Sequence, residues 1–284
     1  MKKFMIALFL FLFATYAQAT ILTYRHYNNI SEATCETKIA GGTPYIGTDS
    51  SSPDGPNVLV FPHPAGLTGG NTPAECWDGF SNQKDIWVQY YFKKSSNWQY
   101  QDVLDKHFFM KNNAPDSHAS GMLMGTGYGG GSDCGYPEAN GKGLWTEVQA
   151  LYGGDGAGAD VYSPNTSKVC SVNPLSRNVW HKVKMHLVMN TSGSRNGTIQ
   201  LWIDDVLVAN HVGTVNHNKY GSTTSFNLWN WNPIWGGMGG KINQIQNFYV
   251  DGLVIATQES DLPAPASVPL PGKAPMAPQT LTIN

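Results

Sequence analysis

The chain has 284 residues, of which 13% are charged, and its formal net charge is −2. A nearly neutral chain without a basic run is a poor partner for nucleic acid or for an anionic membrane surface, so we expect neither. The low share of charged residues, with abundant Gly, Asn, Ser, Thr, Tyr and Trp, favours a β-rich, loop-rich extracellular protein over one built from long helices.

The N-terminal residues have the three parts of a secretory signal peptide. Two lysines precede a short Phe- and Leu-rich core at residues 4–13, and Ala-Gln-Ala at residues 17–19 is a small-residue cleavage site of bacterial type. The apolar run is too short to span a bilayer, and no later segment resembles a membrane-spanning helix. We therefore expect removal of residues 1–19 and secretion, either outside the cell or into the periplasm.

Alternation of apolar and polar residues predicts strands along the rest of the chain. Turn residues separate them, for example Asp204-Asp205, and residues 120–143 are predicted to be a Gly-rich loop. The pattern is typical of an all-β, two-sheet antiparallel sandwich in one domain at residues 20–261, followed by a Pro- and Ala-rich tail at 262–284. The expected strands are 21–27, 57–61, 85–94, 105–111, 144–152, 182–189, 199–203 and 206–208, with a last strand around Asp251-Gly252.

The four cysteines are Cys35, Cys76, Cys134 and Cys170. An even number in a secreted protein indicates two disulfides, and four cysteines allow three connectivities. We favour Cys35–Cys76 and Cys134–Cys170, because each pair flanks one loop-rich segment. None lies in a CxxC pair, so a zinc site is not expected.

Several segments together resemble a known superfamily. They are IWVQYYFKKSSNWQ, DKHFF, LWTEVQ, WHKVKMHLVMNTSGSRNGTIQLWIDDVLV and FYVDGLVIAT, within residues 80–257. They resemble the concanavalin A-like jelly roll (the lectin/glucanase superfamily), and more narrowly secreted bacterial polysaccharide lyases of the alginate- and glucuronan-lyase type. The resemblance implies a jelly roll with a concave groove that binds an extracellular polysaccharide.

In such a fold one side of each strand of the concave sheet lines the groove. Aromatic rings there would stack on sugar rings, and amides would bond to hydroxyls, so we expect a polysaccharide or other glycan as the partner of a monomeric protein. Alternation assigns these residues to the groove: Trp87, Gln89, Tyr91 and Lys93; His107 or Lys106; Trp145, Glu147 and Gln149; Lys182, Lys184 and His186.

β-Elimination at a uronic acid needs a group that neutralises the C6 carboxylate, a base that takes the C5 proton and an acid for the leaving oxygen. Gln149 and Lys184 are candidates for neutralisation. His107 or Tyr91 is the candidate base, and Tyr91 or His186 the candidate acid, because histidine titrates near neutral pH. The other groove residues are assigned to substrate binding: Trp87, Gln89, Lys93, Trp145, Glu147 and Lys182.

Two alternatives accompany this hypothesis. A lectin-like module that binds glycan without cleaving it would use the same face. A retaining glycosidase is disfavoured, because it needs paired carboxylates and this strand offers only Glu147. No cofactor is required, but Asp251 with Asp49 or Asp54 could hold a structural calcium ion. We favour the simpler interpretation that Asp251 caps a turn.

Overall fold

The structure is a computed structural model. It describes residues 20–99, 105–112, 122–129, 143–152, 160–161, 167–169, 176–191, 194, 196–215, 225–236 and 240–264. The predicted signal peptide, Cys134 and Cys170 lie outside these ranges, as does the predicted tail after residue 264. Over the described ranges the chain is all-β apart from two short 3-10 turns, η1 (Ile30–Glu32) and η3 (Glu259–Asp261). No helix within them is long and apolar enough to cross a membrane.

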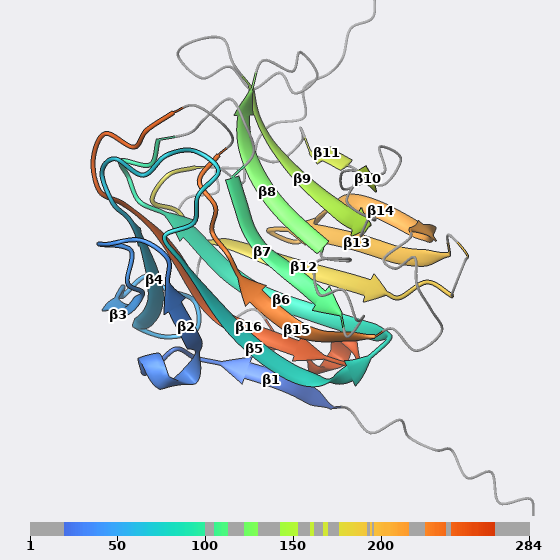
Figure 1. Cartoon of the computed structure of the whole chain (residues 1–284). Helices are drawn as coiled ribbons and strands as arrows, with labels where there is room; N and C mark the ends of the chain where they lie inside the picture. The colour runs from blue at the N-terminus through green and yellow to red at the C-terminus, as the bar shows by residue number, and fades with distance from the viewer. Residues whose placement is uncertain are drawn as a thin grey trace, which may run out of the picture.

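Two antiparallel sheets form the sandwich (Figure 1). The first, which we name sheet 1, contains β1 (Ile21–Arg25), β3 (Tyr45–Thr48), β4 (Asn57–His63), β6 (Asp85–Lys94), β12 (His181–Val188), β13 (Gly197–Ile203), β14 (Val206–Val215) and β16 (Gln246–Ala256). Its strand order is β14-β13-β12-β6-β16-β4-β3, and β1 pairs with β16.

The second sheet, sheet 2, has the order β10-β9-β8-β7-β15-β5-β2, and β11 pairs with β9. Its strands are β2 (Thr34–Thr37), β5 (Ala74–Gln83), β7 (Asp105–Asn112), β8 (Met122–Gly129), β9 (Gly143–Tyr152), β10 (Asp160–Val161), β11 (Ser167–Val169) and β15 (Phe226–Trp231). The chain passes between the sheets several times, for example from sheet 1 to sheet 2 between β6 and β7.

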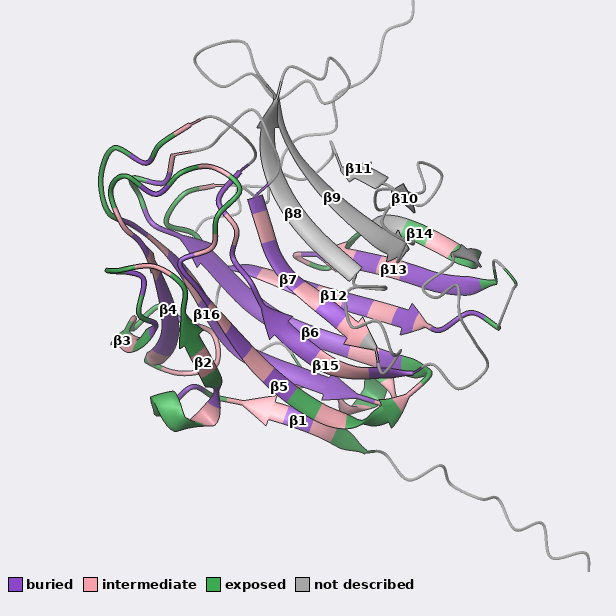
Figure 2. Ribbon diagram, in the orientation of Figure 1, coloured by how far each residue is buried: buried purple, intermediate pink, exposed green. Residues whose placement is uncertain are grey.

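The core lies between the sheets, and aromatic side chains dominate it. Alternate residues of β6 point inward, so Ile86, Val88 and Tyr90 have no exposed surface. From sheet 2, Trp231 meets Tyr90 edge-on with ring centroids 4.9 Å apart. Buried positions run along β6, β16 and β15 in Figure 2. On the strands whose side chains the structure describes, the inward positions are therefore committed to packing, and a ligand would bind on an outer face.

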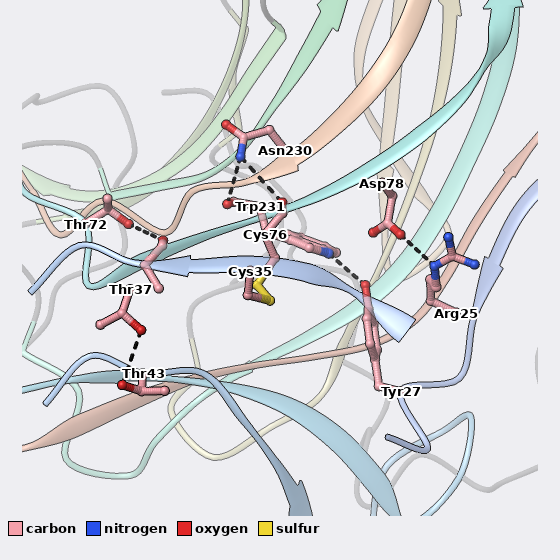
Figure 3. Close-up of a disulfide and its surroundings, with 11 residues drawn as sticks. Arg25, Tyr27, Cys35, Thr37, Thr43, Thr72, Cys76, Asp78, Asn230 and Trp231 are labelled. Carbon is pink, nitrogen blue, oxygen red and sulfur yellow. Dashed lines mark hydrogen bonds and ion pairs between the residues drawn. A yellow bond between two sulfur atoms is a disulfide. The ribbon is translucent and has the colours of Figure 1, made fainter. Parts of the chain in front are cut away.

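A disulfide joins Cys35 of β2 to Cys76 of β5, as predicted, and closes the edge of sheet 2 (Figure 3). Close to it, the indole N–H of Trp231 donates a hydrogen bond of 2.7 Å to the hydroxyl of Tyr27. The guanidinium of Arg25 donates one of 2.6 Å to Asp78. These contacts tie the N-terminal segment across the sandwich.

The structure confirms some expected local features and corrects others. The turn at Asp204-Asp205 has φ values of 50° and 65°, which are typical of a two-residue hairpin loop. Part of the predicted Gly-rich loop at 120–143 is instead the strand β8, between β7 and β9. Strands β2, β3 and β5 were also absent from the prediction, because short or polar segments give weak alternation.

Candidate functional site

The predicted groove residues lie on two different sheets. Strands β6 and β12 are neighbours in sheet 1, whereas β7 and β9 belong to sheet 2. Alternation had placed Lys184 and Gln149 together, but their strands lie in opposite layers of the sandwich. The expectation of one site containing His107, Tyr91, Gln149, Lys184 and His186 is therefore wrong. Alternation is a property of each strand, and it does not say which strands pair.

Within sheet 1, register brings the predicted residues together on the outer face. Trp87 pairs with His186, Gln89 with Lys184, and Tyr91 with Lys182. Paired residues of an antiparallel ladder point to the same side. The sorting of sides on β6 and β12 thus agrees with the structure, although the residues of β7 and β9 do not join them.

Much of this outer face is covered. Lys93 is 7% exposed, and its ammonium pairs with Asp49 of the loop that follows β3. Gln89 is 3% exposed and donates to the carbonyl of Pro263 in the C-terminal segment. Gln89 and Lys93 are therefore buried under other parts of the chain, and the prediction that they line an open groove is wrong.

Tyr91 is also unsuited to the predicted role of base. It is 9% exposed. Burial, then the nearby carboxylates of Asp54, Asp205 and Asp251, raise the pKa of the Tyr91 hydroxyl to about 12. A phenol with that pKa holds its proton near neutral pH and does not serve as a base.

The open part of the outer face of sheet 1 contains an aromatic cluster. The Trp87 and His186 rings are stacked with centroids 4.1 Å apart and an interplanar angle of 7°. Trp202 of β13 lies 5.8 Å from Trp87, inclined by 28°. The Lys184 ammonium is 4.4 Å from the centre of the Trp202 ring. All four side chains are partly exposed. Lys182, in the next row, pairs with Asp205 at the hairpin turn.

His107 lies in the interior, which contradicts the prediction that it faces a groove. It is 1% exposed, and its ring centroid lies 4.7 Å from those of Phe92 and Phe248, which belong to the core of sheet 1. Burial, then the charges of Lys94 and His181, hold the pKa of His107 well below its ordinary value. A β-bulge between Lys106 and Phe108 shifts the alternation here.

The bulge leaves Lys106, the other candidate on this strand, on the outer face of sheet 2. Its ammonium lies 5.9 Å from the centre of the Phe109 ring, and both side chains are partly exposed. Burial lowers the pKa of Lys106. Lys106 pairs with Gly125 of β8, which pairs with Glu147 of β9. Because Gly125 has no side chain, positions 106 and 147 face one another across about 10 Å, two strand spacings.

A row of paired positions runs beside this point across five strands of sheet 2. The register links Gln149 to Leu123, Leu123 to Phe109, Phe109 to Asn230 and Asn230 to Trp77. Four strand spacings correspond to about 19 Å, the length of several sugar units. The Asn230 side chain within the row is fully buried and donates to the carbonyls of Cys76 and Trp231, so the partly exposed members of β7 and β5 are Phe109 and Trp77. Glu147 and, through Gly127, Trp145 are register positions on the same face. Of these, the side chains of β8 and β9 lie outside the described part of the chain.

Of this row the sequence analysis assigned only Gln149 to the site, and Trp77 is the largest of the members that it missed. It is partly exposed, and the Lys38 ammonium lies 5.8 Å from its ring centre. Lys38 in turn pairs with Glu36 at 2.7 Å. The alternation that predicts a strand is present in Ala74-Glu-Cys76-Trp-Asp78, where buried positions alternate with Glu75 and Trp77. The surrounding Gly, Pro and Ser residues favoured a loop assignment instead.

Asp251 caps a loop. Its carboxylate accepts hydrogen bonds from the Ser52 hydroxyl, from the Asp54 amide at 3.3 Å and from the Gly252 amide at 2.9 Å. Gly252 has φ of 57°, and a Cβ atom there would lie 3.0 Å from the Cβ of Asp54. The part of the chain that the structure describes contains no group of three His, Cys, Asp or Glu residues able to hold a metal ion. A calcium ion at Asp251 stays a prediction.

Comparisons place the fold among known proteins. No protein-family model matches the chain, and no curated protein matches it. Solved structures do. The endo-β-1,4-glucuronan lyase from the fungus Trichoderma reesei aligns with a TM-score of 0.59 and 14% identity over 86% of this chain and 98% of that one. A double mutant of alginate lyase Aly36B, in complex with an alginate trisaccharide, gives 0.56 and 14% over 78% and 87%.

A third similar structure is the marine PL-14 alginate lyase from Aplysia kurodai, with a TM-score of 0.54 and 14% identity over 84% of this chain and 99% of that one. The likeness covers nearly the whole length of these proteins. At this level of identity it concerns the fold. The chain is thus an antiparallel jelly roll of the kind found in polysaccharide lyases, as the resemblance of its sequence implied.

Proposed function

We propose that the protein is a secreted polysaccharide lyase that cleaves an extracellular uronic-acid polysaccharide on the outer face of sheet 2. The observation that carries the proposal is Lys106, a half-buried lysine with a lowered pKa on that face, beside a glycine and opposite position 147. The jelly-roll fold, shared with glucuronan and alginate lyases, supports the reaction class.

Lys106 is suited to the role of base. An ordinary lysine is almost fully protonated near neutral pH, whereas burial disfavours the ammonium form and raises the neutral fraction. The neutral amine would take the proton from C5 of the uronate. The electrons of the C5–H bond would form a C4–C5 double bond while the bond from C4 to the leaving oxygen breaks. The Lys106 ammonium would then give its proton to that oxygen, so one residue would act as base and acid.

The row beside Lys106 supplies the other groups that the reaction needs. The amide at position 149 would hydrogen-bond the C6 carboxylate and make the C5 proton more acidic. Phe109 and Trp77 would contact sugar rings on one side of the cut. In this proposal Gln149 has the neutralising role, and Glu147 and Trp145 the substrate-binding roles, that the sequence predicts, while Lys106 replaces His107.

The test is formation of unsaturated uronate ends, which absorb ultraviolet light. The mature protein is incubated with polyglucuronate, with alginate and with a neutral glucan. We expect absorbance to rise on a polyuronide, and Lys106→Ala to lower the rate at least about 100-fold, as loss of a general base does. Lys111→Ala changes a partly exposed lysine on the same strand and is the matched control, with the rate of the wild type.

Two outcomes would contradict the proposal. Wild-type activity in a folded Lys106→Ala protein would remove Lys106 from the mechanism. Binding of a polyuronide without any unsaturated ends, with the polymer length unchanged, would make the protein a lectin-like module. A rate that falls as pH rises would also argue against a neutral amine as the base.

A further inference from the structure

The aromatic cluster on the outer face of sheet 1 has no part in the site proposed on sheet 2. We name Trp87, Lys184, His186 and Trp202 the sheet 1 platform. Elsewhere on the same face, Gln89, Tyr91 and Lys93 are covered by the loop after β3 and by the C-terminal segment. The platform stays partly exposed, although large indole rings normally gain by burial.

Polar contacts hold His186 and Lys184 of the platform, and the indoles of Trp87 and Trp202 lie against these two side chains. His186 Nε2 lies 2.8 Å from Asp85, and His186 Nδ1 lies 3.1 Å from the side-chain oxygen of Gln200. Gln200 donates a hydrogen bond of 2.9 Å to Asn210 on β14. Lys184 pairs with Glu259. Rings and amides held in this way lose little freedom when a ligand binds, which favours binding.

The charges of the platform are balanced. Lys184 is paired with Glu259 and Lys182 with Asp205, and the Asp85 carboxylate lies 2.8 Å from the His186 ring. A polyanion would meet at least as many carboxylates as lysines here and would gain little electrostatic energy. The chemistry that matches exposed indoles with amide and carboxylate neighbours is that of a neutral sugar chain, whose ring C–H faces are apolar and whose hydroxyls both donate and accept.

We propose that the sheet 1 platform is a second carbohydrate-binding site, specific for a neutral polysaccharide. The indoles of Trp87 and Trp202 contact the apolar faces of the sugar rings. The Gln200 and Asn210 amides and the Glu259 carboxylate bond to hydroxyls at the rim. The proposal stands on the geometry of sheet 1 and does not depend on catalysis at sheet 2.

The two sites lie on opposite sides of the sandwich, because each occupies the outer face of a different sheet. They can therefore be filled at the same time. A protein held on a neutral matrix would meet an acidic polysaccharide in that matrix at a raised effective concentration. Neither polymer would compete with the other for its site.

Affinity electrophoresis through gels that contain mixed-linkage β-glucan tests the proposal, with a cellohexaose titration followed by tryptophan fluorescence. We expect the wild type to be retarded. Trp202→Ala and Trp87→Ala should each weaken binding at least about tenfold, as loss of an aromatic anchor does. Trp77→Ala, on sheet 2, and Lys106→Ala should bind the glucan as the wild type does.

Two further, milder variants distinguish a loss of glucan binding from a loss of the fold. Trp202→Phe keeps an aromatic ring and should give intermediate affinity, and Gln200→Ala removes a rim amide and should weaken binding a few-fold. Wild-type affinity in a folded Trp202→Ala protein would overturn the proposal. So would a wild type that neither the glucan gel nor cellohexaose engages, or competition between polyglucuronate and cellohexaose for one site. Failure of the lyase assay alone would leave this result unchanged.

Discussion

The outer faces of the two sheets look alike in the sequence and differ in the structure. Both combine lysines, amides and aromatic residues on alternate positions. On sheet 1, Lys93, Lys182 and Lys184 each pair with a carboxylate. On sheet 2, Lys106 lies over Phe109 beside a glycine, and burial lowers its pKa. Burial lowers the pKa of Lys93 as well, but the Lys93 ammonium is held by Asp49. A lysine held by a carboxylate is suited to a structural role, whereas Lys106, whose ammonium form burial disfavours on the face proposed for catalysis, is suited to proton transfer.

The largest expected effect separates these two lysines directly. Lys106→Met should lower the rate of unsaturated-end formation at least about 100-fold, because no neutral amine remains to take the C5 proton. Lys184→Met, on the opposite face, should leave the rate within about twofold. Initial rates on polyglucuronate at several substrate concentrations measure both. An equal loss of rate in the two variants would mean that the catalytic site cannot be assigned to sheet 2.

The second effect concerns the interior that positions Lys106. The preceding residue, Asp105, accepts hydrogen bonds from Lys94 at 3.0 Å, from the Trp98 indole at 3.1 Å and from the Gly236 amide at 3.0 Å. It is 2% exposed, and burial raises its pKa while Lys94 opposes the shift. Asp105→Ala removes the carboxylate beside a buried ammonium and should cost about 3–5 kcal/mol of unfolding free energy.

Urea unfolding followed by tryptophan fluorescence measures that loss. Asp105→Asn keeps the shape and part of the hydrogen bonding and should lose less than Asp105→Ala. A cost below about 1 kcal/mol for the alanine variant would show that Lys94 finds compensation elsewhere. In that case the backbone pairing of β7, without the Asp105 contacts, would be sufficient to position Lys106.

Residue-level patterns predicted the sides of individual strands well. On β6 the alternation places Ile86, Val88 and Tyr90 inward and Trp87 outward, as the burial confirms. On β7 the same reasoning left His107 and Lys106 open. The bulge there puts His107 among core rings and Lys106 outside. A bulge adds one residue to a strand, and the residue types in DKHFF do not predict where it occurs.

The assembly of strands into sheets could not be predicted in this way. Whether β6 pairs with β12 or with β7 depends on contacts between residues far apart in the chain, while alternation reports only on neighbours. Strand β8 was missed because MLMGTGYG is rich in glycine, which lowers the intrinsic preference for a strand. Yet Gly125 of that strand is the register position between Lys106 and Glu147, where we propose the site.

A smaller effect tests whether the covered part of sheet 1 is structural. Burial, opposed by the Ser52 hydrogen bond, raises the pKa of Asp251 to about 7 from 3.8. The folded state therefore binds the proton more tightly than the unfolded chain does. This contribution to stability is complete below pH 3.8 and is lost as the pH rises through about 7. Between pH 5 and pH 8 the loss amounts to about 2–3 kcal/mol.

Asp251→Asn removes this titration. The unfolding free energy of the wild type should fall more steeply from pH 5 to pH 8 than that of the variant, and urea unfolding at four pH values compares them. Parallel curves would show that the carboxylate is ionised throughout, as expected if a bound cation held it. Running the series with and without added Ca²⁺ would then test the predicted calcium site, since only a bound ion makes the difference depend on calcium.

The smallest expected effect belongs to the rim of the sheet 1 platform. Lys184 pairs with Glu259, whose side chain is 52% exposed, and lies over the Trp202 ring. Exposed ion pairs contribute about 0–1 kcal/mol, and a partly exposed cation–π contact adds a similar amount. Lys184→Gln, Glu259→Gln and the double variant form a double-mutant cycle. The coupling in unfolding free energy should stay below about 1 kcal/mol and decrease in high salt.

A coupling of several kcal/mol would mean that the ion pair helps to hold the C-terminal segment on sheet 1. A small coupling, with weaker binding of cellohexaose by Lys184→Gln, would mean that this exposed face is maintained for contact with a ligand and contributes little to folding.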